Sequence, residues 1–183
     1  MEIIVGKLAG FCFGVNNAVT KTEELLKKEN NIYCLGELVH NKQIIENLER
    51  QGLTTIENIN EAPKGSKIII RAHGAEPKIY VQAQENGNKI YDYTCPKVIK
   101  THEDVEENKE ERYIFIVGVK NHPEIIATKG FSGDNSYVIE TIEDIQEAII
   151  KFKESNLKKI YIISQTTFSL KKFNEYVEKI SEE

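Results

Sequence analysis

Short runs of apolar residues alternate along this chain with longer segments in which apolar residues recur every three or four positions. The short runs have the length and the β-branched content of buried strands, whereas the longer segments have the period of amphipathic helices. We therefore expect strands at residues 2–8, 32–36, 53–56, 67–72, 89–93, 113–117, 136–139 and 159–163. Strands that alternate with helices across crossover-length connections indicate an α/β fold with mainly parallel sheets.

The helical segments are bounded by residues that favour helix ends. One helix should start at Gly14, and a second should open at the loop over residues 37–41 and stop at Gly52, a typical C-terminal residue. Two more are expected over residues 76–86 and 96–109. The last two are marked by apolar residues at helical spacing, namely Ile142, Ile145, Ile149 and Phe152, and then Leu170, Phe173, Val177 and Ile180.

The pattern divides near Cys95 and Pro96 into two halves of similar size. We expect a first α/β domain over residues 1–95 and a second over residues 96–183. Each half contains an apolar strand that runs into a loop with Gly and His, at residues 70–74 and 117–122. This likeness indicates two related units, although it is too weak to prove duplication.

Two cysteines stand where a predicted strand gives way to a predicted helix. Pro96 follows Cys95 and suits the first position of a helix, and Cys12 lies between the strand at residues 2–8 and the next helix. The positive end of a helix dipole lowers the pKa of a thiol and favours the thiolate that binds metals. Two such cysteines, far apart in sequence, indicate two halves that meet at one cofactor. Cys34 lies within a short strand and is expected to be a buried, inert thiol.

Composition and charge narrow the classes of function. The 183 residues are 40% hydrophobic and 29% charged, as in ordinary globular chains, and no apolar run approaches the roughly 20 residues of a membrane span. Three cysteines without a signal-like leader predict a reducing, cytoplasmic setting. The net charge of −5 argues against nucleic acid, so an anionic ligand would need local His, Lys or helix N-termini.

Chemically active residues gather at the predicted strand ends, where open α/β sheets bind their ligands. Any one of them has an ordinary interpretation as a capping or packing residue, but the joint pattern favours a site. His102 is the contrast, because it lies inside a predicted helix between Val98 and Val105 and is interpreted as structural. The candidates are Cys12, His40, His73, Cys95, His122, Glu124, Thr166 and Thr167.

The spacing of the cysteines matches no zinc knuckle, which needs close pairs of ligands. Single, widely spaced thiolates fit an iron–sulfur cluster at a domain interface. Histidines around such a cluster would donate to phosphate oxygens, and Glu124 would relay a proton.

At these residues the chain resembles the 4-hydroxy-3-methylbut-2-enyl diphosphate reductases of the non-mevalonate isoprenoid pathway. Six motifs occur in the family's order and extend over the whole chain. They are Gly10-Phe11-Cys12-Phe13-Gly14-Val15, Glu37-Leu38-Val39-His40-Asn41, Arg71-Ala72-His73-Gly74, Asp92-Tyr93-Thr94-Cys95-Pro96, Asn121-His122-Pro123-Glu124 and Ser164-Gln165-Thr166-Thr167.

The resemblance implies a trefoil of three α/β domains around a 4Fe-4S cluster that three cysteines hold. It implies that Cys12 and Cys95 are metal ligands and that the reaction is a reductive dehydroxylation giving isopentenyl and dimethylallyl diphosphates. A ferredoxin or flavodoxin would supply the electrons. The remaining roles implied are substrate binding by His40, His73, His122 and Thr166, and catalysis by Glu124, His122 and Thr166.

The family pattern continues into a third domain with a third cysteine ligand, which this chain does not include. We therefore expect residues 1–9 to form a strand that lacks its partner sheet, the cluster to be labile and the chain to be inactive by itself. Two other classes remain open. One is a non-catalytic α/β module that binds a phosphorylated ligand or a metal through His and Cys, and the other is a redox sensor built on the two thiols.

Overall fold

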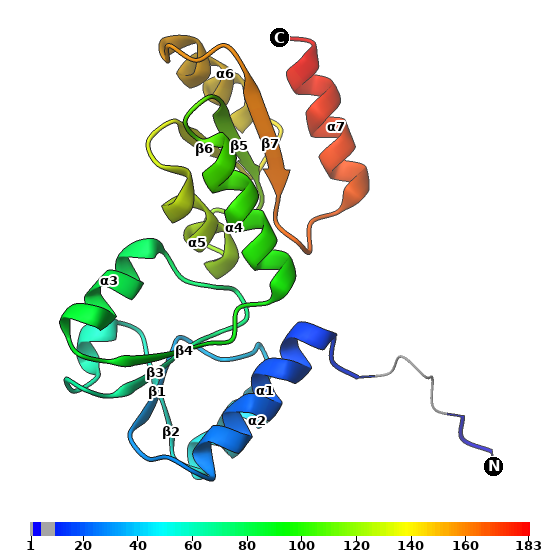
Figure 1. Cartoon of the computed structure of the whole chain (residues 1–183). Helices are drawn as coiled ribbons and strands as arrows, with labels where there is room; N and C mark the ends of the chain where they lie inside the picture. Colours follow the sequence, from blue (N-terminus) through cyan, green and yellow to red (C-terminus); the bar gives the residue numbers. More distant parts are fainter. Residues whose placement is uncertain (1, 5–9) are drawn as a thin grey trace.

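The computed structural model describes residues 2–4 and 10–183. Within them the chain has an α/β fold with seven α-helices and two separate sheets, in which every strand pair is parallel. Figure 1 shows the two sheets one above the other, joined by the segment between β4 and α4. The fold class predicted from the sequence is therefore confirmed.

The first sheet has the strand order β2-β1-β3-β4. Cys34 of β1 and Ile69 of β3 are in register and face α1 and α2, whereas Ile68 and Ile70 face η1 and α3. Both faces are thus covered, as is usual for parallel sheets. The elements are α1 (Phe13–Leu26), β1 (Ile32–Leu35), α2 (Lys42–Arg50), β2 (Leu53–Ile56), the 3₁₀ turn η1 (Ile59–Glu61), β3 (Lys67–Ile70), α3 (Pro77–Glu85) and β4 (Lys89–Asp92).

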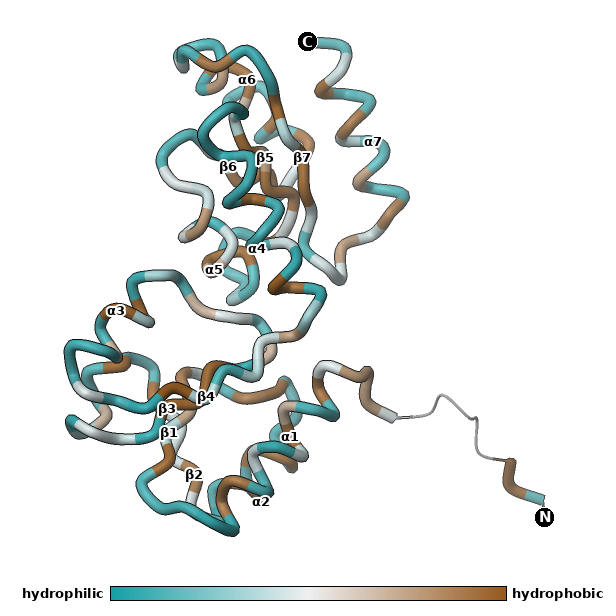
Figure 2. The backbone as a smooth tube through the Cα atoms, in the orientation of Figure 1, coloured by the Kyte–Doolittle hydropathy of each residue, from teal (hydrophilic) through white to brown (hydrophobic). Residues whose placement is uncertain are grey.

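The second sheet has the order β6-β5-β7, with the fully buried β5 at its centre. Phe115 faces α6 and α7, whereas Ile114 and Ile116 face α4 and α5. Figure 2 shows apolar residues concentrated in the strands and polar residues along the outer sides of the helices. The elements are α4 (Pro96–Asn108), β5 (Tyr113–Val117), α5 (Pro123–Ser132), β6 (Ser136–Ile139), α6 (Asp144–Glu154), β7 (Ile160–Ser164) and α7 (Leu170–Ser181).

Two glycines allow the halves of the chain to approach closely. A Cβ at Gly130 of α5 would lie 2.9 Å from the Cβ and Cγ of Glu76, at the start of α3. A Cβ at Gly74 would lie 2.8 Å from Cε1 of His102 on α4, and Gly74 also has a φ of +77°. A side chain at either position would have to displace its neighbour.

Seven of the eight predicted strands are present, with ends within two residues of the predicted ones. The eighth, at residues 2–8, falls largely outside the described residues, and residues 2–4 have no regular secondary structure. The sequence pattern did not predict α5 or the short turn η1. Within the described part of the chain, no helix combines the length and apolar character needed to cross a membrane.

Candidate functional site

Three histidines from three different loops come together beside the strand ends. The ring centroids of His40 and His73 are 5.0 Å apart, those of His73 and His122 are 5.1 Å apart, and those of His40 and His122 are 6.2 Å apart. One ligand atom from each ring lies within 4.8 Å of the others. We call His40, His73 and His122 the histidine triad.

The local sequence explains how each loop presents its imidazole. The loop after β1 is anchored by the buried Leu38 and Val39, so that His40 is left exposed. His122 is the N-cap of α5, and its Nδ1 accepts a hydrogen bond from the backbone N–H of Glu124 at 3.2 Å. Because Nδ1 is the acceptor, the neutral imidazole of His122 carries its proton on Nε2.

Two members of the triad, His73 and His122, have surroundings that favour the neutral imidazole. Burial, helped by the nearby guanidinium of Arg71, lowers the pKa of His73 to about 4, and burial also lowers the pKa of His122. Nδ1 of His73 is buried and has no hydrogen-bond partner in the described part of the chain. Neutral imidazoles are the form that binds metals, and an added anion would favour the protonated form. The triad therefore suits either a metal ion or a phosphate group.

A small cavity of about 240 Å³ opens beside two members of the triad. Phe11, Val15 and Ala72 provide apolar walls, and His40 and His73 provide the polar ones. An apolar cavity with a few convergent polar groups is the usual form of a small-ligand site.

Glu124 is the buried acid of the site, with 2% of its surface exposed. Its Oε1 accepts a hydrogen bond from the backbone N–H of Thr166 at 2.6 Å, and its Oε2 accepts one from the Thr166 hydroxyl at 2.9 Å. Both oxygens are therefore directed at a single residue beyond β7. The structure thus brings together two of the candidate residues named from the sequence.

The two candidate thiols occupy equivalent positions. Cys12 is the exposed N-cap of α1, and Cys95 is the half-buried N-cap of α4. The first turn of α1 packs against Cys95, since a Cβ on Gly14 would lie 2.8 Å from the Cys95 Sγ. The two cysteine-bearing turns are thus neighbours, and they fit two ligand positions of an iron–sulfur cluster. Cys34 does not fit, because it is fully buried and burial raises the pKa of its thiol to about 12.

Asp92 shapes the turn that holds Cys95, a role that the sequence analysis missed. Its Oδ1 accepts hydrogen bonds from the backbone N–H and the hydroxyl of Thr94, and its Oδ2 accepts one from Tyr80 at 2.7 Å. An Asp followed two residues later by Thr is a recognisable turn signal that could have indicated this.

Two residues singled out in the sequence lie outside this arrangement. Thr167 accepts a hydrogen bond from the side chain of Gln165 at 2.9 Å and makes none with Glu124 in the described part of the chain. His102 is 7% exposed and stacks on Phe131 at 4.3 Å between ring centroids. Its surroundings support the structural interpretation of His102.

Parallel sheets with imidazoles, thiols and a buried carboxylate beyond their strands define an α/β protein with a ligand site at the strand ends. The chain belongs to the LytB protein family, whose sequence profile matches residues 3–183. This confirms the resemblance identified from the six motifs.

Curated relatives agree with this assignment. The chain is 38% identical to the 4-hydroxy-3-methylbut-2-enyl diphosphate reductase of Caldanaerobacter subterraneus subsp. tengcongensis over 97% of its own length. It is 36% identical to the enzyme of the same name from Clostridioides difficile over 100% of its length. The chain spans 62% and 64% of the lengths of these two relatives.

Solved structures agree as well. The E-1-hydroxy-2-methyl-but-2-enyl-4-diphosphate reductase of Plasmodium falciparum superposes with a TM-score of 0.86 at 32% identity, over 96% of this chain and 55% of that one. A structure of (E)-4-hydroxy-3-methyl-but-2-enyl diphosphate reductase, the terminal enzyme of the non-mevalonate pathway, gives 0.84 at 37% identity, over 98% of this chain and 63% of that one.

Proposed function

We propose that this chain carries the substrate-binding and proton-transfer groups of an iron–sulfur reductase. The reaction would be the reductive dehydroxylation of 4-hydroxy-3-methylbut-2-enyl diphosphate to isopentenyl and dimethylallyl diphosphates. The observation that carries the proposal is the convergence of three imidazoles, of which one nitrogen each lies within 4.8 Å of the others. The names of the relatives support the choice of substrate.

The histidine triad would bind the diphosphate. Imidazole N–H groups donate to phosphate oxygens, and His122 presents its Nε2 proton away from the helix that uses its Nδ1. A bound anion would raise the pKa values that burial lowers in His73 and His122. Charge-assisted hydrogen bonds from protonated imidazoles would then add to the affinity.

Glu124 and Thr166 would handle protons. The Thr166 hydroxyl donates to Oε2 of the ionised Glu124. Once Oε2 is protonated, the hydroxyl would accept that proton and release its own to a substrate carbon or a leaving oxygen. The two hydrogen bonds from Thr166 fix the carboxyl group in one orientation before substrate arrives.

Cys12 and Cys95 would hold a 4Fe-4S cluster on the neighbouring helix starts. When bound, the cluster would supply the two electrons of the reduction, which a ferredoxin or flavodoxin would replace. Since the buried Cys34 is unsuited as a ligand, only two thiols of this chain are available. We therefore expect labile iron and no turnover when the chain is assayed alone.

Anaerobic reconstitution with iron and sulfide tests the proposal. We expect visible iron–sulfur absorption that Cys12→Ala and Cys95→Ala each abolish and that the matched variant Cys34→Ala retains. Calorimetry with the diphosphate substrate should show binding that His40→Asn and His73→Asn weaken. Iron loading that depends on Cys34 as much as on Cys95 would contradict the proposed ligand set.

A second candidate function is a metal-binding module without turnover, and the close approach of the three imidazoles favours it. Such a site would use neutral imidazoles to bind zinc. Stoichiometric zinc that His122→Asn removes and Cys95→Ala leaves in place would favour this module over the reductase.

A further inference from the structure

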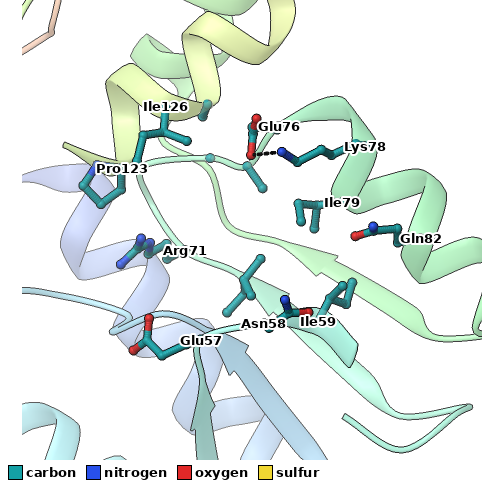
Figure 3. Close-up of a pocket in the computed structure, with 14 residues that line it drawn as sticks. Glu57, Asn58, Ile59, Arg71, Glu76, Lys78, Ile79, Gln82, Pro123 and Ile126 are labelled. Atoms are coloured by element: carbon teal, nitrogen blue, oxygen red, sulfur yellow. Dashed lines mark ion pairs between the residues drawn. The ribbon is translucent and has the colours of Figure 1, made fainter. Parts of the chain in front are cut away.

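A second pocket is lined in part by Arg71 and includes none of the three histidines of the triad. Its volume is about 340 Å³, within the roughly 300–1,000 Å³ usual for small-ligand sites. Residues of η1, α3 and α5 line it together with the ends of β1 and β3, so both halves of the chain contribute. Figure 3 shows Arg71, Glu57 and Pro123 on one side and Ile59, Ile79 and Gln82 on the other.

Arg71 brings a positive charge into this pocket without a negative partner. In the described residues no carboxylate oxygen lies within 4.0 Å of its guanidinium. Its one side-chain hydrogen bond there is a long one, 3.4 Å, to the carbonyl oxygen of Glu37. A guanidinium has five N–H donors, so most of its donor capacity is available to a ligand.

Gly36 makes this placement of Arg71 possible. A Cβ at Gly36 would lie 2.5 Å from Nη1 and 2.6 Å from Cζ of Arg71, and Gly36 has a φ of +70°. The backbone at residue 36 therefore forms a seat for the guanidinium that only glycine provides without strain.

Glu57 supplies the complementary charge. Its carboxylate makes no hydrogen bond or ion pair with a described residue, although it is near enough to Arg71 to interact with its charge. The other two charges of the pocket, Lys78 and Glu76, already pair at 2.9 Å. The pocket thus has one available positive group and one available negative group.

Apolar side chains complete the lining of the pocket. Ile59 is 1% exposed and holds the floor, whereas Ile79 of α3 and Ile126 of α5 form the sides. A ligand with a branched hydrocarbon body would bury its apolar surface here.

We propose that this pocket binds a zwitterionic α-amino acid with a short apolar side chain. Its carboxylate pairs with Arg71, its ammonium pairs with Glu57, and its side chain packs on Ile59, Ile79 and Ile126. A bidentate guanidinium–carboxylate pair provides orientation as well as affinity. The inference stands independently of the proposed reductase function, because it uses none of the triad, the thiols or Glu124.

Three probes with one hydrocarbon body test the proposal: leucine, 4-methylvalerate, which lacks the amino group, and isoamylamine, which lacks the carboxylate. The chain is labelled on its isoleucine methyl groups and titrated with each probe by NMR. We expect saturable shifts at Ile59 and Ile79 but not at Ile149, which lies in the core of the second sheet. Leucine should bind at least about tenfold more tightly than either analogue, since one ion pair at this site is worth about that factor.

Variants locate the binding. Arg71→Gln and Glu57→Gln should each weaken leucine binding about tenfold. In Arg71→Gln the affinity of leucine should approach that of isoamylamine, and in Glu57→Gln it should approach that of 4-methylvalerate. Glu57 is exposed, so Glu57→Gln keeps the test valid if Arg71→Gln fails to fold. The matched control is Lys42→Gln, which removes an exposed charge on α2 and should leave binding unchanged.

Several results would overturn the proposal. Absence of saturable shifts with leucine would mean that Arg71 and Glu57 simply turn to pair with each other. Equal affinity for 4-methylvalerate would show that Glu57 takes no part. Leucine-dependent shifts confined to isoleucines outside this pocket, such as Ile149, would place the ligand elsewhere.

Discussion

Both carboxylate oxygens of Glu124 accept hydrogen bonds from Thr166 at the end of the second sheet. The backbone N–H donates at 2.6 Å, and the hydroxyl donates at 2.9 Å. Glu124 stands in the first turn of α5, and Thr166 stands in the loop after β7. Since β5 and β7 are neighbours in register, the loops that leave them emerge side by side. The pair therefore depends on sheet order rather than on sequence proximity.

Glu124→Gln should separate proton transfer from substrate binding. Gln keeps the shape and can still accept the Thr166 N–H, but it cannot carry the transferable proton. In a fusion where this chain replaces the matching part of the Clostridioides difficile reductase, we expect turnover to fall by at least about 100-fold, the usual contribution of a general acid. Substrate affinity should change less than about threefold, or roughly 0.65 kcal/mol.

The control for that experiment is Thr167→Val, because the Thr167 hydroxyl accepts from Gln165 and makes no hydrogen bond to Glu124 in the described part of the chain. It should lower turnover less than Glu124→Gln does. Equal losses of affinity and rate in Glu124→Gln would instead make Glu124 a structural residue.

Pyrophosphate binding to this chain should strengthen as pH falls. Without a ligand, the pKa of His73 in the folded protein is about 4, so its imidazole is neutral at pH 7. A bound anion favours the protonated form. Affinity is therefore expected to rise between about pH 7 and pH 5 by about tenfold, the change that one pKa unit represents. Calorimetry at each pH measures it.

Pyrophosphate itself titrates over part of this range, so the comparison is with His73→Asn under the same conditions. The pH dependence that remains in the variant belongs to the ligand and to other groups of the protein. Identical profiles in both proteins would exclude His73 as a source of the effect.

Acid should destabilise the fold through His102. Burial lowers the pKa of His102 from 6.5 to about 4, so between these values the unfolded chain binds more protons than the folded one. The free energy of unfolding should therefore fall as pH drops through that window, by about 2–3 kcal/mol for this group. Urea unfolding at pH 7 and pH 4 measures the change.

His102→Phe should retain the stacking on Phe131 and lose the titration. The acid-induced loss of stability should be smaller in the variant than in the parent chain, with the remainder coming from groups such as His73. An equal loss in both would show that the ring of His102 stays solvated when charged, despite its surroundings.

Gly14→Ala should impair iron loading although alanine is the better helix former. The substitution would add helix propensity worth about 1 kcal/mol, but the new methyl group would meet Cys95 Sγ at 2.8 Å. We expect reconstituted iron to fall by more than half while thermal stability changes little. Val19→Ala on the same helix is the matched control. Full iron loading in Gly14→Ala would mean that Cys95 can move without loss of its ligand role.

Seven of the eight strands predicted from the sequence are present, and the clearest of them are short, continuous apolar runs such as residues 113–117. The sequence pattern did not predict α5, and the reason is physical. That helix buries polar residues, including Glu124, Thr128 and Ser132, alongside Ile125, so it lacks the amphipathic period on which helix prediction depends. Its N-cap is a histidine rather than the usual Ser, Thr, Asp or Asn.

The candidate site was predictable to the extent that it follows from strand direction. Parallel strands place their carboxyl-end loops at one edge, which is why His40 and His73 could be expected to meet. The seat of Arg71 on Gly36 could not be foreseen, because it depends on packing between elements far apart in sequence. The hold of Asp92 on the Cys95 turn is local, since Asp92 and Thr94 are two residues apart, and the sequence pattern could have indicated such a turn.

The close packing of Gly130 links the two ends of α5 mechanically. Gly130 rests on the start of α3, and His122 lies eight residues away at the other end of the same helix, about 12 Å along its axis. Because a helix is rigid, a displacement of Gly130 would also move the imidazole of His122 at the N-terminal end of α5. The position of His122 is therefore coupled to the packing of Gly130, where an added methyl group would lie only 2.9 Å from the Cβ and Cγ of Glu76.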